Sequence, residues 1–132
     1  MSSKIYTLSK LSEILKSERK NLKKIILCHG VFDLLHVGHI KHLEKAKKLG
    51  DKLVVTITAD KFVNKGPGRP VFNQSLRSEA IAAIESVDYV AINDSQTAIN
   101  PIKFLKPNIY CKGKDYKNFK DDLTGEIKNE IK

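Results

Sequence analysis

Apolar residues occur along the chain in short continuous runs that are separated by longer polar stretches. Four of these runs are rich in β-branched or aromatic residues, a pattern typical of strands that are buried on both faces of a sheet. The predicted strands are residues 23–29 (KKIILCH), 52–58 (KLVVTIT), 88–93 (DYVAIN) and 108–113 (NIYCKG).

Apolar residues recur at helical spacing in the segments before and between these runs, which predicts amphipathic helices. Asn73 is suited to cap the third helix, Gly50 to end the second, and Pro101 to occupy the first turn of the last. The first helix is expected to pack on the outside of the domain. The predicted helices are residues 8–20, 38–50 and 74–87, followed by a short helix within residues 97–108.

This alternation favours an α/β fold, with a Rossmann-like parallel sheet and helices on both faces in a three-layer sandwich. We expect residues 1–132 to form a single domain that opens with a helical segment at 1–21. Parallel strands all end at one edge of the sheet, where ligands bind near the point at which strand order reverses. The loops expected there are 29–39, 59–72, 93–97 and 112–119.

Composition and charge narrow the function classes. The 132 residues carry a net charge of +9, which an anionic substrate, a nucleic-acid partner or a solvated lysine-rich surface would each explain. The lysines are scattered and rarely interleaved with aromatic residues, which argues against a nucleic-acid module. No apolar run approaches the roughly 18–20 residues of a membrane span. We expect a cytoplasmic protein without nucleic-acid or membrane partners, with Cys28 and Cys111 as buried free thiols.

The stretch CHGVFDLLHVGH, residues 28–39, concentrates the candidate chemistry. Gly30 follows a predicted strand and Gly38 lies where the next helix begins, so backbone can approach a ligand beside the free N–H groups of a helix N-terminus. His36 and His39 are three residues apart, so they share one face if the helix begins near His36. Both imidazoles could therefore donate hydrogen bonds to phosphate and stabilise charge on a phosphoryl group under attack.

Other interpretations of the histidines stay open at this point. With His42, the pair forms an i, i+3, i+6 series that could hold a metal ion. Three ligands on one short helix converge poorly, however, and no cysteine or carboxylate stands at zinc-ligand spacing, so no metal ligand is predicted. His36 and His39 could also be ordinary hydrogen-bonded loop residues. For His29 and His42, structural roles are expected.

Four sequence blocks in order resemble a known family. GVFDLLHVGHIKHLEKAKKLGD is similar to the signature of the HxGH nucleotidyltransferases, in their cytidylyltransferase-like branch. The similarity continues through KGPGRPV, SLRSEAIAAIESVDYV and KPNIYCKGKDY, and covers about residues 22–119. The order looks closest to the adenylyltransferase domain of bifunctional heptose-phosphate kinase/adenylyltransferases, and it is also similar to glycerol-3-phosphate cytidylyltransferase.

The resemblance implies transfer of a nucleotidyl group from ATP or CTP to a sugar phosphate or polyol phosphate, with release of pyrophosphate, as in lipopolysaccharide or cell-envelope precursor synthesis. The acceptor phosphate would attack the α-phosphorus in line, and Mg²⁺ would accompany the triphosphate. A homodimer and a downstream kinase domain in a longer parent protein are also implied. The alternative function is a nucleotide-binding or regulatory domain that keeps the fold without turnover.

By position in the family motif, the resemblance implies that His36 and His39 contact the nucleotide phosphates and stabilise the transition state. It implies that Lys65 lies over the triphosphate or the acceptor phosphate, and that Arg77 contacts the acceptor phosphate. The implied binding residues are Gly30, Phe32, Asp33, Gly38, Arg69, Lys112, Gly113 and Asp115.

Simpler explanations compete with several of these assignments. Loop cations such as Lys65 could be solvated charge, and Arg77 could pair with Glu79 or another carboxylate. Asp33 could cap its loop, and Phe32 could serve packing.

The chain departs from the family pattern in one place. Relatives carry a later segment similar to GxSTT, at the start of a final helix that cradles the triphosphate and the base. This chain ends at Lys132 without such a segment. Either the domain is truncated at its C-terminal end, which we favour, or this protein has lost that element, and we expect weakened triphosphate binding.

Overall fold

The computed structural model describes residues 3–63, 68, 70–95 and 97–112. Its strands and helices alternate along the chain, as the sequence pattern predicts. The strands are β1 (Ile25–Gly30), β2 (Lys52–Thr58), β3 (Tyr89–Asn93) and β4 (Ile109–Lys112). The helices are α1 (Leu8–Lys20), α2 (Val37–Lys47), α3 (Gln74–Ala82) and α4 (Ile99–Leu105), with a short 3-10 helix η1 (Asp60–Phe62) after β2.

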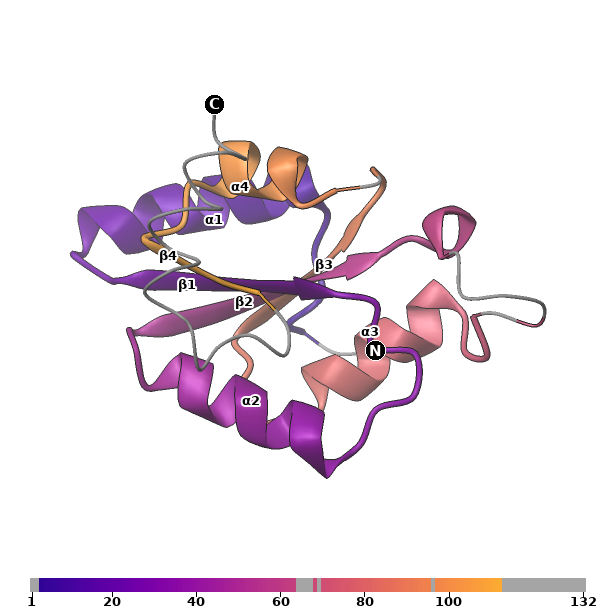
Figure 1. The fold of residues 1–132 in the computed structure, drawn as a ribbon. Helices are drawn as coiled ribbons and strands as arrows, with labels where there is room; N and C mark the ends of the chain where they lie inside the picture. The colour runs from indigo at the N-terminus through magenta and orange to yellow at the C-terminus, as the bar shows by residue number, and fades with distance from the viewer. Residues whose placement is uncertain (1–2, 64–67, 69, 96, 113–132) are drawn as a thin grey trace.

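The described strands form one parallel sheet in the order β3-β2-β1-β4. Helices α1 and α4 cover one face of this sheet and α2 and α3 cover the other, which gives three layers (Figure 1). The predicted α/β class, the parallel sheet and the three-layer sandwich are confirmed.

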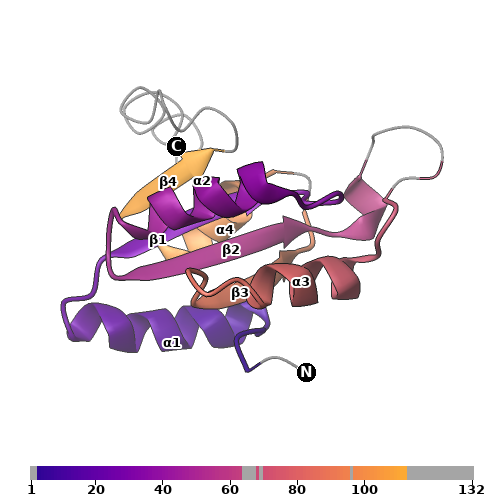
Figure 2. The same ribbon diagram turned by 90° about the horizontal axis from the view of Figure 1, so that it is seen from below.

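The faces on which the helices lie follow from the direction in which the chain crosses the sheet. From β1 through β2 to β3 the chain moves one way, and right-handed crossovers then place α2 and α3 on the same face (Figure 2). From β3 it returns past β2 and β1 to β4, so α4 lies on the opposite face. Strand order therefore reverses between β1 and β4, and their carboxyl ends mark the expected ligand edge.

Each central strand contributes apolar side chains to both cores. On β1, Ile26 and Cys28 pack toward α2 and α3, whereas Ile25 and Leu27 pack toward α1 and α4. Cys28 pairs in register with Cys111 on β4, and both are buried and free, as predicted. The Cys111 thiol and burial raise the pKa of Cys28, so this residue stays a thiol.

Several element bounds agree with the sequence pattern, and others differ for a physical reason. The bounds of α1 and β2 agree to the residue, and the Asn73 side chain caps α3 by accepting from the Leu76 N–H, at 2.9 Å. Helix α3 ends at Ala82 rather than at residue 87, because the chain then turns while still burying Val87.

Among the described helices, none has the length and apolar character needed to cross a bilayer.

Candidate active site

His36 and His39, from the stretch CHGVFDLLHVGH, cap the N-terminus of α2. His36 is the N-cap residue, and its Nδ1 accepts from the backbone N–H of Gly38 at 2.9 Å. His39 reaches back, and its Nδ1 accepts from the backbone N–H of His36 at 3.1 Å. The two ring centroids lie 4.2 Å apart. This is a capping box in which imidazoles take the places usually held by Ser or Thr and Glu.

These hydrogen bonds determine which ring nitrogen carries the proton. An Nδ1 that accepts from a backbone N–H has no hydrogen of its own, so each neutral ring carries its proton on Nε2. His36 is exposed and His39 is half-buried. The N-terminus of α2 therefore presents paired Nε2–H donors together with the positive end of the helix dipole, an arrangement suited to phosphate.

The predicted glycines lie directly under the aromatic rings of this loop. A Cβ on Gly38 would stand 2.6 Å from Cε1 of His36, and a Cβ on Gly30 would stand 2.9 Å from the Phe32 ring. Phe32 itself has φ of 52°, in the left-handed region that bulky residues rarely adopt. Its ring meets that of His39 edge-on, with centroids 5.8 Å apart. Phe32 thus packs between the end of β1 and the histidine pair.

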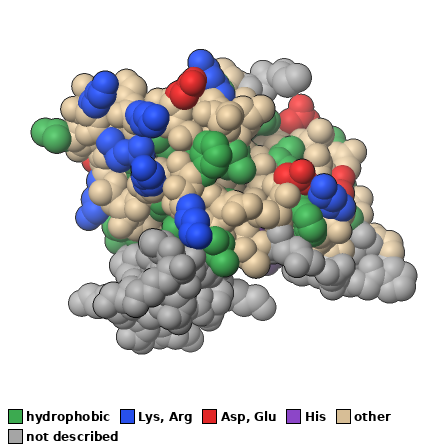
Figure 3. All heavy atoms as spheres, turned by 90° about the horizontal axis from the view of Figure 1, so that it is seen from above, with side chains coloured by type: hydrophobic (Ala, Val, Ile, Leu, Met, Phe, Trp, Pro, Cys, Tyr) green, Lys and Arg blue, Asp and Glu red, His purple; other side chains and the backbone are tan. Residues whose placement is uncertain are grey.

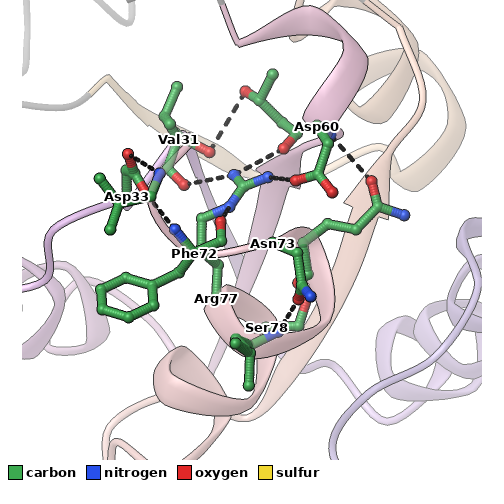
Figure 4. Close-up of polar contacts among 12 residues, drawn as sticks. Val31, Asp33, Asp60, Phe72, Asn73, Arg77 and Ser78 are labelled. Carbon is green, nitrogen blue, oxygen red and sulfur yellow. Dashed lines mark hydrogen bonds and ion pairs between the residues drawn. The ribbon is translucent and has the colours of Figure 1, made fainter. Parts of the chain in front are cut away.

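Arg77 is a buried cation beside this loop, with 1% of its surface exposed. Its Nη1 donates to the carbonyl oxygens of Val31 and Thr58, both at 2.8 Å, and its Nε donates to the carbonyl of Phe72 at 3.0 Å. Its Nη2 pairs with Oδ1 of Asp60 at 2.6 Å (Figure 4). The guanidinium therefore joins the ends of β1 and β2 to the start of α3. Contact of Arg77 with an acceptor phosphate stays a prediction.

Asp33 anchors the same region from the other side. It is 6% exposed, and its two carboxylate oxygens accept from the backbone N–H groups of Val71 and Phe72, each at 2.9 Å. Figure 4 shows this carboxylate beside the guanidinium network. Asp33 thus caps the segment ahead of α3, and its predicted place near the substrate stays untested.

Asp60 is the carboxylate partner of Arg77 and was not among the site residues predicted from the sequence. Its backbone N–H also donates to Oε1 of Gln74 at 3.0 Å, which ties η1 to the first turn of α3. The available signal was its place: a carboxylate that directly follows a buried strand shares the carboxyl edge with the helix that carries Arg77.

A cavity of about 290 Å³ opens between the loop after β1 and α3. Phe32, Leu35, Phe72 and Leu76 contribute much of its lining, so its walls are mainly apolar. A triphosphate needs N–H donors and positive charge instead. The candidate phosphate site is therefore placed by the histidines and not by this cavity.

The other two histidines have the structural positions expected for them. The ring of His29 lies between two hydroxyls, with Nδ1 2.8 Å from Oγ1 of Thr56 and Nε2 3.3 Å from Oγ1 of Thr58. Burial lowers the pKa of His29 to about 4. Burial, followed by the charge of His39, also lowers the pKa of His42. Both rings therefore stay neutral near pH 7.

The remaining predicted residues lie mostly outside the described part of the chain. Lys112 ends β4, pairs in register with His29, and so reaches the edge where strand order reverses; only its backbone is described. Lys65, Arg69, Gly113 and Asp115 lie outside the described residues.

Basic side chains gather over the helical face that α1 and α4 form (Figure 3). Lys16 and Lys20 are exposed on α1, Lys103 is exposed on α4, and Lys106 is exposed directly after α4. The histidine loop lies with α2 on the opposite side of the sheet. Part of the positive net charge is therefore solvated surface away from the candidate site.

Within the described residues, no group of three potential ligands gathers in a way that could hold a metal ion.

A parallel sheet whose order reverses beside β1, with paired imidazole donors on a helix N-terminus at that edge, defines an α/β protein suited to nucleotide phosphates. Residues 27–131 match the family described as cytidylyltransferase-like, and the chain belongs to this family of nucleotidyltransferases. The resemblance expected from the sequence is thereby confirmed.

Individual relatives agree with this family. The bifunctional protein HldE of Aliarcobacter butzleri is 44% identical over 123 residues, which cover 91% of this chain and 26% of that protein. The bifunctional protein HldE of Campylobacter jejuni (strain RM1221) is 47% identical over 108 residues, which cover 80% of this chain and 23% of that protein. The chain thus spans about a quarter of the length of these curated relatives.

A solved structure also matches this fold. It is the crystal structure of the lipopolysaccharide core biosynthesis protein from Thermoplasma volcanium GSS1. The TM-score is 0.68 at 31% sequence identity, and the match covers 81% of this chain and 88% of that chain.

Proposed function

We propose that this chain transfers a nucleotidyl group from ATP or CTP to a sugar phosphate or polyol phosphate and releases pyrophosphate. The name of the Thermoplasma relative, a lipopolysaccharide core biosynthesis protein, favours a sugar phosphate. The resemblance to the adenylyltransferase domains of bifunctional heptose-phosphate enzymes makes ATP and a heptose phosphate the first pair to test.

The observation that carries the proposal is the capping box of His36 and His39. Each imidazole accepts through Nδ1 from a backbone N–H, so the group with which it can donate to a phosphate oxygen is its Nε2–H. Donors held in place before the substrate arrives stabilise developing charge without reorganising during the reaction.

In the proposed reaction, an oxygen of the acceptor phosphate attacks the α-phosphorus of the triphosphate. The new bond joins that oxygen to the α-phosphorus, and the bond from the α-phosphorus to the bridging oxygen breaks, which releases pyrophosphate. The Nε2–H groups of His36 and His39 bind the phosphate oxygens on which negative charge increases. No residue of the chain becomes covalently attached.

Other parts of the site are proposed by family position. Lys65 and Arg69 would contact the triphosphate or acceptor phosphate, and Lys112, Gly113 and Asp115 would lie near the nucleotide. Two anions must meet in this reaction, so cations beside them reduce the repulsion. Mg²⁺ is proposed as a companion of the triphosphate, whose negative charge it would partly neutralise.

We further propose a cytoplasmic homodimer, and a kinase domain in a longer parent protein. Cross-linking and mass photometry of the chain measure the first of these directly.

Pyrophosphate release from ATP and from CTP, measured with a panel of phosphorylated sugars and polyols, tests the proposed function. We expect His39→Ala to lower turnover at least 100-fold, in the range typical of a lost transition-state donor. His42→Gln, a change on the same helix, is the matched control and should keep turnover within about threefold of the unaltered chain. Equal activity in the His39 variant and the unaltered chain would refute the assigned role. Calorimetric nucleotide binding without any turnover would favour the regulatory alternative.

A further inference from the structure

The loop that carries His36 and His39 is held by a polar network that begins on β2 and α3. Arg77 binds the carbonyl of Val31, and Asp33 binds two backbone N–H groups ahead of α3. The residue between these two anchors is Phe32, whose backbone has φ of 52°. The Phe32 ring in turn packs edge-on against His39. The network thus fixes the loop on both sides of the residue that contacts His39.

The Arg77 guanidinium can hold this loop only in one orientation, because its side chain is fully buried and its Nη1 serves two carbonyl oxygens at once, those of Val31 and Thr58. Asp60 supplies the only carboxylate on this guanidinium among the ion pairs of the described residues. Its Oδ1 lies 2.6 Å from Nη2, and its backbone is tied to Gln74. A buried guanidinium without its counter-charge loses the partner that balances and orients it.

We propose that Asp60 is a positioning residue for the histidine pair. Its carboxylate orients the guanidinium of Arg77, the guanidinium holds the backbone at Val31, and this anchor keeps Phe32 where its ring supports His39. Asp60 need not touch either substrate. The expected kinetic effect rests on the proposed function, whereas the effect on the His39 ring does not.

The test compares Asp60→Asn and Asp60→Ala with Asp88→Ala in the full chain. Asp88 is a matched carboxylate at the opposite edge of the sheet, where it pairs with Lys47 and accepts from the Leu53 N–H. The readouts are kcat and KM for pyrophosphate release with ATP or CTP and the best acceptor of the panel, the melting temperature, and the imidazole NMR signal of His39 in the substrate-free protein.

We expect a graded loss of kcat, about fivefold for Asp60→Asn and tenfold or more for Asp60→Ala, with KM for the acceptor changed less than threefold. Asp88→Ala should lower the melting temperature while keeping kcat within twofold. The His39 signal should move in both Asp60 variants and stay in place in the Asp88 variant. If the alanine variant does not fold, the asparagine variant still gives the comparison.

Two results would overturn the proposal: an unmoved His39 signal in the Asp60 variants, or equal losses of kcat in the Asp60 and Asp88 variants. If the unaltered chain releases no pyrophosphate with any substrate pair, the proposed function fails. The His39 signal then decides the positioning role by itself.

Discussion

His29 links the end of β1 to the pH dependence of stability. The ring is held between Thr56 and Thr58, and burial lowers its pKa to about 4. In the unfolded chain, the pKa returns to about 6.5. The unfolded chain therefore binds a proton at His29 at a pH where the folded chain does not.

The sign and size of the effect follow from this difference. The stabilisation from keeping His29 neutral is fully present above pH 6.5 and is lost as the pH falls toward 4. Between pH 7 and pH 4.5, the free energy of unfolding should fall by about 2–3 kcal/mol on account of His29 alone.

The perturbation is His29→Asn, which removes the titrating ring and keeps an amide that can bond to Thr56. Urea unfolding of both proteins at pH 7.0 and pH 4.5 gives the two free-energy differences. At pH 7 the variant should be about 1 kcal/mol less stable, because one hydrogen bond is lost. From pH 7 to pH 4.5 it should lose about 2–3 kcal/mol less than the parent chain. An equal fall in the free energy of unfolding between pH 7.0 and pH 4.5 in both proteins would refute the reasoning. His42 titrates in both proteins, so its contribution cancels in the comparison.

Three further substitutions test the local structure. Gly38→Ala gains about 1 kcal/mol of helix propensity but displaces the ring of His36, so urea unfolding should change little while pyrophosphate release falls about tenfold or more. Asn73→Ala removes the cap of α3 and should cost about 1 kcal/mol in urea unfolding, whereas a cost near zero would mean that the cap adds nothing. Leu15→Ala leaves a cavity between α1 and the sheet and should cost about 2–5 kcal/mol in the same measurement, and an unchanged midpoint would contradict the packing.

The fold was predictable because its signals are local. The apolar runs of β1 and β2 and the helical spacing of residues 8–20 report burial directly. The end of α3 was missed because Val87 stays buried after the helix has ended at Ala82, so the apolar pattern does not show the turn.

The site was predictable only in part. The spacing of His36 and His39 indicated a shared helix face, but it did not show that each ring caps the helix through Nδ1. The sequence predicts that Arg77 contacts an acceptor phosphate or pairs with a carboxylate, but it does not show that the side chain is buried. Its burial depends on carbonyl oxygens from three separate segments, and backbone groups leave no mark in a sequence pattern. Asp60 was missed although its place after the strand at residues 52–58 was a signal for the carboxyl edge of the sheet.

The most direct test of nucleotidyl transfer is ³¹P NMR of the chain with ATP or CTP, Mg²⁺ and a sugar phosphate. We expect new resonances of a mixed pyrophosphate diester that joins nucleotide and sugar, formed in equal amounts with pyrophosphate, and we expect these resonances to be lost in His39→Ala. Release of orthophosphate with a nucleoside diphosphate, or equal product formation by His39→Ala, would contradict this expectation.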